Sequence, residues 1–396
     1  MMTEMDCTCS QKRHFAPVKR IEVSEGAIEK VPEILSDYKK IFMVADENTY
    51  AVAGKRVESL LKEKGILSHI CILEKDALPT AANVGKVLIC VGRDEPVYDI
   101  THFSDNPDYI LAVGSGSVND ICRMVSYRLG IEYGIVGTAP SMDGYASVVA
   151  PLLVDHRKIV YTCSIARHII IDLDVAAKAP EELLLAGIGD MIGKYIAILD
   201  WELSRRYTGE YYCEKVADMV LDATGKCIRS AEKLLERDPL VVKDTVDGLI
   251  LSGMGIAYTG SSRPASGTEH MIGQTWEIMS LERGERPNLH GIEVGEATFA
   301  AMEMYERLYA ETDDPELKAL IGKYIPGFRT VETLQKTLRI PCTVQDKGQY
   351  IEGILRGRTF RERYTLLQYL YEKNMLEDYA EKSYAPVMSK YCFDRR

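Results

Sequence analysis

Long hydrophobic runs are missing from this 396-residue sequence, which has no apolar stretch near the ~18 residues that a membrane-spanning helix needs. Its first residues, MMTEMDCTCSQKRH, are polar and lack the apolar centre of a secretory signal. We therefore expect no membrane insertion and a cytoplasmic location.

An excess of positive charge is also missing. The chain has 48 Lys and Arg against 59 Asp and Glu, for a net charge of -11. Nucleic acids and anionic membranes are bound by basic surfaces, so neither is an expected partner. A small anionic substrate would need a local basic pocket.

The ten cysteines include no C-x-x-C pair. This scatter is more typical of reduced thiols than of a disulfide framework. Cys7 and Cys9 could in principle bind a metal together with His14. A solvated terminal segment is the more ordinary expectation for that region.

Histidine is scarce, and only two of the seven histidines follow residue 168. His270 and His290 each lie where a helical pattern begins, and the polar turn ERGERPN between the two helices lets both imidazoles point into one gap. Asp190, a lone acid in the apolar segment GIGDMIGK, is the best third ligand, because a buried carboxylate there needs a cation. Two imidazoles and one carboxylate leave positions open, as in a catalytic metal site. The alternative is that both histidines are ordinary core or capping groups.

Hydrophobicity alternates between strand and helix periods in the first half of the chain. The apolar segments 39–46, 86–92, 109–113 and 133–136 predict strands with helices between them, and hence a parallel sheet covered on both faces. Residues 147–171 predict a hairpin at the rim of that sheet. From residue 175 the pattern is helical. The expected domains are therefore 1–176, an α/β domain, and 177–396, an all-α domain.

The segment GSGSVND directly follows the strand predicted at 109–113. Glycines let a diphosphate approach the backbone, and the start of the next helix offers free N–H groups to its oxygens. A tight structural turn is the alternative, because a dinucleotide-binding fingerprint would have glycine where this chain has Asn119. Asp46, at the end of the first predicted strand, is either a ribose ligand or a helix cap. As a ribose ligand it would repel a 2'-phosphate and favour NAD over NADP.

The motifs GSGSVND, TAPSMDGYAS, GIGDMIGK and SRPASGTEHMIG, followed by HG, resemble in this order those of the sn-glycerol-1-phosphate dehydrogenase family. That family belongs with iron-containing alcohol dehydrogenases, glycerol dehydrogenase and dehydroquinate synthase. The resemblance implies a dehydroquinate synthase-like fold with the active site between a dinucleotide-binding and a helical domain. It also implies a homodimer, NAD or NADP as cofactor, and one divalent metal ion, zinc or nickel and possibly iron.

Site residues follow from matching these motifs one residue at a time. Asp143 and Asp190 would be catalytic, with Asp143 meeting the substrate, and Asp190, His270 and His290 would hold the metal. Gln274 stands where the family usually has a substrate-binding histidine, so a proton relay there is in doubt. Arg263 is our choice of phosphate donor, with a surface arginine as the alternative. The cofactor residues would be Asp46, Gly114, Gly116, Ser117, Val118, Asn119, Asp120, Thr138, Ser141 and Ser147.

The expected reaction is the interconversion of dihydroxyacetone phosphate and sn-glycerol 1-phosphate. Gln274 keeps a second possibility open, a dehydrogenase for glycerol or another small polyol. A cyclase like dehydroquinate synthase, which regenerates its NAD within one cycle, is a third. A non-catalytic binding protein would be expected to lose metal or diphosphate residues, and none is lost.

Overall fold

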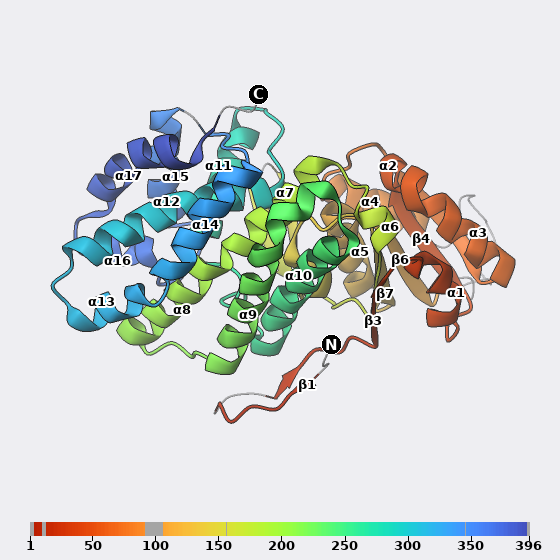
Figure 1. Ribbon diagram of the computed structural model, residues 1–396. Coiled ribbons are helices and arrows are strands. Elements are labelled where there is room, and N and C mark those ends of the chain that lie inside the picture. The colour runs from red at the N-terminus through yellow and green to blue at the C-terminus, as the bar shows by residue number, and fades with distance from the viewer. Residues whose placement is uncertain (1–3, 10–12, 92–105, 156, 345, 394–396) are drawn as a thin grey trace. The chain divides into compact units, whose positions relative to one another are not determined.

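The computed structural model describes residues 4–9, 13–91, 106–155, 157–344 and 346–393 (Figure 1). Contacts divide the chain into two compact units. The first, here called the sheet unit, comprises residues 1–6, 13–140 and 144–179. The second, the helical unit, comprises residues 7–12, 141–143 and 180–396. Among the described residues, no helix is both long and apolar enough to cross a membrane.

The sheet unit is built on six parallel strands in the order β3-β10-β7-β6-β4-β5. Every residue of β4 and β6 is buried, which explains why these strands are continuously apolar rather than alternating. The alternation of strands and helices thus confirms the predicted α/β class. The strands are β3 Arg20–Ser24, β4 Ile41–Asp46, β5 Leu67–Leu73, β6 Tyr109–Gly114, β7 Glu132–Gly137 and β10 His168–Asp172.

Helices and two small antiparallel pairs complete the sheet unit. The pairs are β1 Glu4–Met5 with β2 His14–Phe15, and β8 Val149–Val154 with β9 Arg157–Thr162. The helical segments are η1 Ala27–Lys30, α1 Val31–Ile34, α2 Glu47–Thr49, η2 Tyr50–Gly54, α3 Lys55–Lys64, α4 Ala81–Cys90, α5 Gly116–Leu129, η4 Asp143–Ala146 and α6 Leu173–Ala176.

Two sequence predictions for this unit are wrong. The strand predicted at 86–92 is instead the end of helix α4, which starts where the Thr80 hydroxyl accepts from the N–H of Asn83; Gly92 lies outside the described residues. The short apolar run was compatible with either structure. Residues 168–172 do not belong to a rim hairpin, because β10 lies inside the sheet, between β3 and β7. The hairpin itself is confirmed as β8 and β9.

The helical unit follows from residue 180. Its long helices are of two kinds: α12 buries most of its 22 residues, whereas α9 and α17 bury fewer than half of theirs and are amphipathic. The elements are α7 Glu181–Ile192, α8 Lys194–Thr208, α9 Glu214–Ser230, η5 Ala231–Glu236, α10 Pro239–Thr259, α11 Thr268–Glu282, α12 His290–Glu311, α13 Pro315–Gly322, α14 Ile325–Leu338, α15 Lys347–Gly357, α16 Leu366–Glu372 and α17 Leu376–Tyr391.

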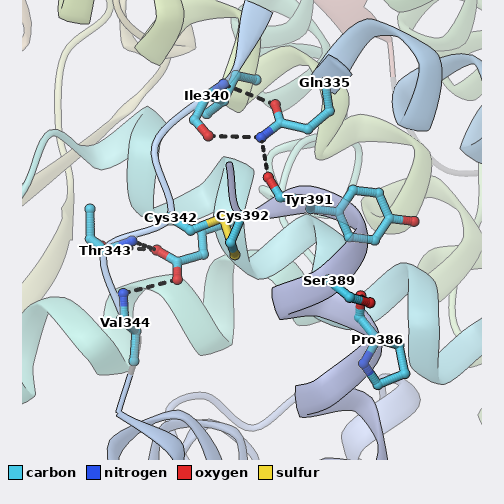
Figure 2. Close-up of a disulfide and its surroundings, with 10 residues drawn as sticks. Gln335, Ile340, Cys342, Thr343, Val344, Pro386, Ser389, Tyr391 and Cys392 are labelled. Atoms are coloured by element: carbon cyan, nitrogen blue, oxygen red, sulfur yellow. Dashed lines mark hydrogen bonds between the residues drawn. A yellow bond between two sulfur atoms is a disulfide. The ribbon is translucent and has the colours of Figure 1, made fainter. Parts of the chain in front are cut away.

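A disulfide joins Cys342, after α14, to Cys392, after α17 (Figure 2). The Gln335 side chain reinforces the junction, since its amide donates to the carbonyls of Ile340 and Tyr391. The expectation of reduced thiols is therefore wrong for this pair. The two cysteines are 50 residues apart, and spacing alone could not reveal them. The other eight cysteines form no disulfide in the described chain.

Candidate metal and substrate site

Helices α7 and α12 of the helical unit approach each other closely because glycines face the contact. A Cβ added at Gly291 would overlap the carbonyl of Ala186, and one added at Gly189 would overlap the carbonyl of Gly291. Only glycine permits this spacing. The contact places Asp190, next to Gly189, close to His290, next to Gly291.

The three predicted metal ligands come together here. One ligand atom from each of Asp190, His270 and His290 lies within 4.8 Å of the others. The Nε2 atom of His270 is 3.8 Å from Oδ1 of Asp190, and the two imidazole ring centroids are 5.1 Å apart. Three helices, α7, α11 and α12, supply one ligand each, so the arrangement depends on their packing.

Asp190 is fully buried, and its two oxygens are both hydrogen-bonded. The Nζ of Lys194, one turn later, donates to Oδ1 at 2.6 Å, and the backbone N–H of Asp143 donates to Oδ2 at 2.8 Å. Lys194 is equally buried and also donates to the carbonyl of Ala265 at 3.1 Å. Lys194 therefore orients the Asp190 carboxylate and does not face solvent.

Asp143 is the second carboxylate of the cluster. Its Oδ2 lies 2.8 Å from Nζ of Lys194 and accepts a 2.8 Å hydrogen bond from the Ser252 hydroxyl. Burial and the neighbouring Asp190 raise the pKa of Asp143. Two acids thus share a single lysine, which leaves net negative charge at a buried place. Such a charge is costly unless a cation balances it.

Glu269 orients the first metal histidine. Its Oε1 is 2.6 Å from Nδ1 of His270 and also accepts from the N–H of Gly267 at 2.9 Å. When Glu269 is ionised, Nδ1 carries the proton and Nε2 keeps its lone pair for a metal. Burial raises the pKa of Glu269 to about 8, and Asp200 adds to the rise.

The residues present fit a divalent metal ion. Two imidazoles and a carboxylate suit zinc, nickel or iron. The carboxylate that supports His270 and the lysine that holds Asp190 are the kind of outer contacts that usually accompany such ligands. The acid-rich surroundings favour a bound cation, and three ligands leave room for a substrate.

A group of arginines surrounds Gln274, one turn beyond His270 on α11. Arg361 donates to Oε1 of Gln274 at 3.0 Å and to the Ser262 hydroxyl at 3.2 Å. Arg363 donates to the same hydroxyl at 2.6 Å and to the carbonyl of Ser266 at 3.0 Å. In the described ranges neither arginine forms an ion pair with a carboxylate.

At this arginine pair, burial outweighs the attraction of nearby carboxylates, of which Glu269 acts on both side chains. Burial, together with the nearby Arg361 and Arg263, lowers the pKa of Arg363 to about 9. Burial also lowers the pKa of Arg361. Both side chains line a pocket, and guanidinium groups without an acidic partner there are suited to binding an anion.

Arg263, the predicted phosphate donor, is occupied differently. It is buried and ion-paired with Glu210, and its other N–H groups donate to the carbonyl of Tyr364 at 2.9 Å and the hydroxyl of Ser204 at 3.2 Å. It is therefore not a surface arginine. Its N–H groups join separate segments of the chain, so Arg361 and Arg363 are better candidates than Arg263 as donors to an anion.

The predicted diphosphate loop lies in the sheet unit, between β6 and α5. Gly114 pairs with Gly137 at the carboxyl ends of neighbouring strands, and the N–H of Thr138 donates to the Gly114 carbonyl at 3.0 Å. The two predicted cofactor loops therefore start side by side. A Cβ at Gly114 would press on Val118, so this turn requires glycine. Gly116 and Ser117, at the start of α5, remain partly exposed.

Other predicted cofactor residues have structural partners. Asn119 is buried and donates to the carbonyl of Gly144 at 3.1 Å, and Asp120 pairs with Arg123 at 2.7 Å. Both side chains thus hold the loop in place. The main-chain N–H groups at Gly116 and Ser117 are the better placed donors to a diphosphate.

Asp46 caps helix α2, which is one of the two roles that the sequence left open for it. Its carboxylate accepts from the N–H of Thr49 at 2.8 Å, and the Thr49 hydroxyl accepts from the N–H of Asp46 at 3.0 Å. Ser147 is buried, with its hydroxyl accepting from the N–H of Val149 at 3.1 Å. Ser141 is buried and belongs to the helical unit with Asp143.

Sequence reasoning missed Glu269, Ser252, Arg361 and Arg363. Glu269 directly precedes a predicted ligand histidine, so its position was a usable signal. The basic segment RGRTFRER, 356–363, was another. Ser252 gave no signal, because only the packing of α10 brings it to Asp143.

Known proteins resemble this chain over most of its length. Residues 22–180 match the iron-containing alcohol dehydrogenase family. The glycerol-1-phosphate dehydrogenase [NAD(P)+] of Halalkalibacterium halodurans is 33% identical over 393 residues, covering 93% of this chain and 96% of the relative. That of Staphylothermus marinus is 29% identical, covering 92% and 94%.

Solved structures share the fold. A glycerol dehydrogenase from Schizosaccharomyces pombe superposes with a TM-score of 0.67 at 15% identity, covering 95% of this chain and 93% of that one. An iron-containing alcohol dehydrogenase from Thermococcus thioreducens gives 0.70 at 13% identity, covering 94% and 99%. The identity to the curated relatives, over nearly their whole length, goes further than the fold: this chain belongs to the glycerol-1-phosphate dehydrogenase family.

Proposed function

We propose that the protein interconverts dihydroxyacetone phosphate and sn-glycerol 1-phosphate, with NADH or NADPH as the hydride carrier. One observation carries the proposal. His270, one member of a cluster of one carboxylate and two imidazoles, lies on the same helix, α11, as Gln274, which accepts a hydrogen bond from Arg361. A metal site and an anion site next to each other suit a phosphorylated ketone.

We propose the same division of labour for the two parts of the chain. Residues 1–176 would bind the dinucleotide, with Gly116 and Ser117 against its diphosphate, and residues 177–396 would bind metal and substrate. Helix α5 supports this, since its 14 residues start with free N–H groups beside the glycine turn. The Asp46 carboxylate caps α2 through Oδ1, and its Oδ2 would meet the ribose and so favour NAD over NADP.

When bound, a divalent ion would supply positive charge opposite the ketone oxygen, and the reduced nicotinamide would supply the hydride. Asp190, His270 and His290 would hold that ion, and Glu269 would keep His270 in the tautomer that binds it. Asp143 would accept from a substrate hydroxyl.

Lys194 lies between the two acids and contacts both of them. Although burial opposes its charged form, Asp143 and Asp190 raise the pKa of Lys194 above its usual value. It therefore stays protonated at neutral pH and is no proton donor to the product. Its role is to fix both carboxylates and offset one of their two charges.

Arg361 and Arg363 would bind the substrate phosphate. Burial lowers the pKa values of both arginines, and repulsion between them adds to the effect at Arg363. A dianion bound between them would stabilise their positive charges. Gln274, bonded to Arg361, would hold that guanidinium in place instead of contacting phosphate as a charged group. This accounts for an uncharged residue at position 274.

The reaction itself is tested by steady-state oxidation of NADH and NADPH with dihydroxyacetone phosphate. Protein stripped of metal should be inactive and should recover with zinc or nickel. Chiral analysis should find the 1-phosphate of sn-glycerol. Faster turnover of unphosphorylated glycerol would favour the polyol dehydrogenase that Gln274 left open, and absence of net cofactor oxidation with substrate would favour a cyclase.

The phosphate subsite is tested by Arg361→Met and Arg363→Met. Each should raise the KM for dihydroxyacetone phosphate roughly tenfold or more, as expected for loss of a charge-assisted contact, and leave the low rate on dihydroxyacetone unchanged. The matched control is Arg356→Met, on the same basic segment but paired with Glu282 and Glu352 at the surface. Equal losses on both substrates would contradict the assignment.

The homodimer and the cytoplasmic location implied by the resemblance and the sequence also stand as proposals. Sedimentation equilibrium of the purified protein decides the first, and cell fractionation decides the second.

A further inference from the structure

A second group of metal-binding side chains lies far from the first in sequence. Cys7 and Cys9 lie between β1 and β2, and Cys213 immediately precedes α9. Contacts place all three cysteines in the helical unit. Their Sγ atoms lie within 4.8 Å of one another, and those of Cys7 and Cys213 are 3.6 Å apart. None of the three has a role in the proposed reaction.

The spacing fits a tetrahedral ion. Zinc binds thiolates at about 2.3 Å, which puts two sulfurs of a tetrahedron about 3.8 Å apart. The 3.6 Å between Cys7 and Cys213 is close to that value. Ordinary packing of apolar thiols does not require three sulfurs to converge on one point.

Polar groups lie next to the sulfurs. The backbone N–H of Cys9 points at the Cys7 sulfur at 3.4 Å, and the Tyr211 hydroxyl is 3.1 Å from the Cys9 sulfur. Cys213 is fully buried and stands at the N-cap of the 17-residue helix α9. Such contacts commonly support metal-bound sulfur.

We propose that Cys7, Cys9 and Cys213 bind a structural zinc ion. Three thiols lose their protons to solvent as the ion binds. The ion fastens the N-terminal loop to the start of α9. A bound ion would thus give Cys7 and Cys9 a role other than the solvated terminal segment expected from the sequence.

Metal counting tests the proposal independently of the catalytic metal. Wild-type protein reconstituted with zinc should hold two ions per chain. His270→Ala should hold one, and so should Cys9→Ser, while the control Cys90→Ser should hold two. A single ion in wild type that persists in Cys9→Ser would overturn the proposal and leave the proposed function intact.

Cobalt substitution identifies the ligands. Thiolate-to-cobalt charge-transfer absorption should appear in wild type and His270→Ala and be absent in Cys9→Ser, because the other cluster contains no sulfur. If Cys9→Ser does not fold, alkylation of wild type decides: zinc should slow modification of Cys7 and Cys9 roughly tenfold or more but not that of Cys90. A Cys7–Cys213 disulfide in protein prepared with zinc and without oxygen would overturn the site.

Discussion

The two clusters of ligand side chains differ in chemistry and in how the chain builds them. The catalytic cluster of Asp190, His270 and His290 uses oxygen and nitrogen from three packed helices. The cysteine cluster of Cys7, Cys9 and Cys213 takes its sulfur atoms from two connecting segments. It therefore depends much less on the packing of the core.

This contrast shows what each cluster is suited to do. The catalytic cluster has three ligands, a lysine and two further acids around it, and an arginine-lined pocket nearby. Open coordination positions and charged groups around the ligands are typical of a catalytic metal site. The cysteine cluster has no comparable set of charges in the part of the chain that the structure describes, which suits the structural role that we propose for it. Each prediction below should affect the first cluster and spare the second.

The largest effect should come from Asp190→Asn. The amide keeps the shape of the side chain but removes the charge that binds the metal, so turnover should fall on the order of 10³-fold or more. Steady-state assays and metal counting measure this. The cobalt–thiolate absorption should persist. The exposed Asp218→Asn, on α9, is the control and should behave as wild type. Full activity would contradict the metal assignment.

Gly291→Ala should be next. Its Cβ would overlap the backbone of Ala186, so α7 and α12 must move apart, at a cost of about 1–3 kcal/mol and with weaker metal binding at the catalytic cluster. Urea unfolding and zinc titration measure both effects. The control is Gly85→Ala, within α4 and facing open space, which should gain up to about 1 kcal/mol. Similar results for the two variants would show that the helix contact tolerates expansion.

Glu269→Gln should have the smallest effect. The amide can still accept from His270, but it no longer makes that imidazole a stronger ligand, so affinity for the catalytic metal should fall about 10- to 100-fold. Activity measured against free zinc concentration should recover at high zinc. Glu282→Gln, at the exposed end of the same helix, is the control. Loss of activity at saturating zinc would assign Glu269 a different role.

The parts of the molecule that could be predicted from the sequence are those in which the local environment restricts the residue type. The continuously apolar β4 and β6, and the glycine turn after β6, were visible because burial on both faces and close backbone contact restrict residue type. The ordered motifs indicated Asp190, His270 and His290, which the structure brings together.

What sequence reasoning missed depends on distant packing. The sequence around Cys213 does not predict its contact with Cys7, which lies 206 residues earlier. The sequence around Cys342 likewise does not predict its bond to Cys392. Arg263 and Arg361 look alike in sequence, and only their partners separate a buried structural arginine from one available to an anion. The helix α4 was misread because four to six apolar residues fit either period.

The cross-link between Cys342 and Cys392 encloses α15, α16 and α17 in a covalent loop, and Arg361 and Arg363 lie inside that loop. Closing 50 residues removes chain entropy from the unfolded ensemble worth about 4 kcal/mol. The arginines that we expect to hold the phosphate therefore sit on a tethered segment, whose ordering before substrate arrives is assisted by a bond as well as by packing.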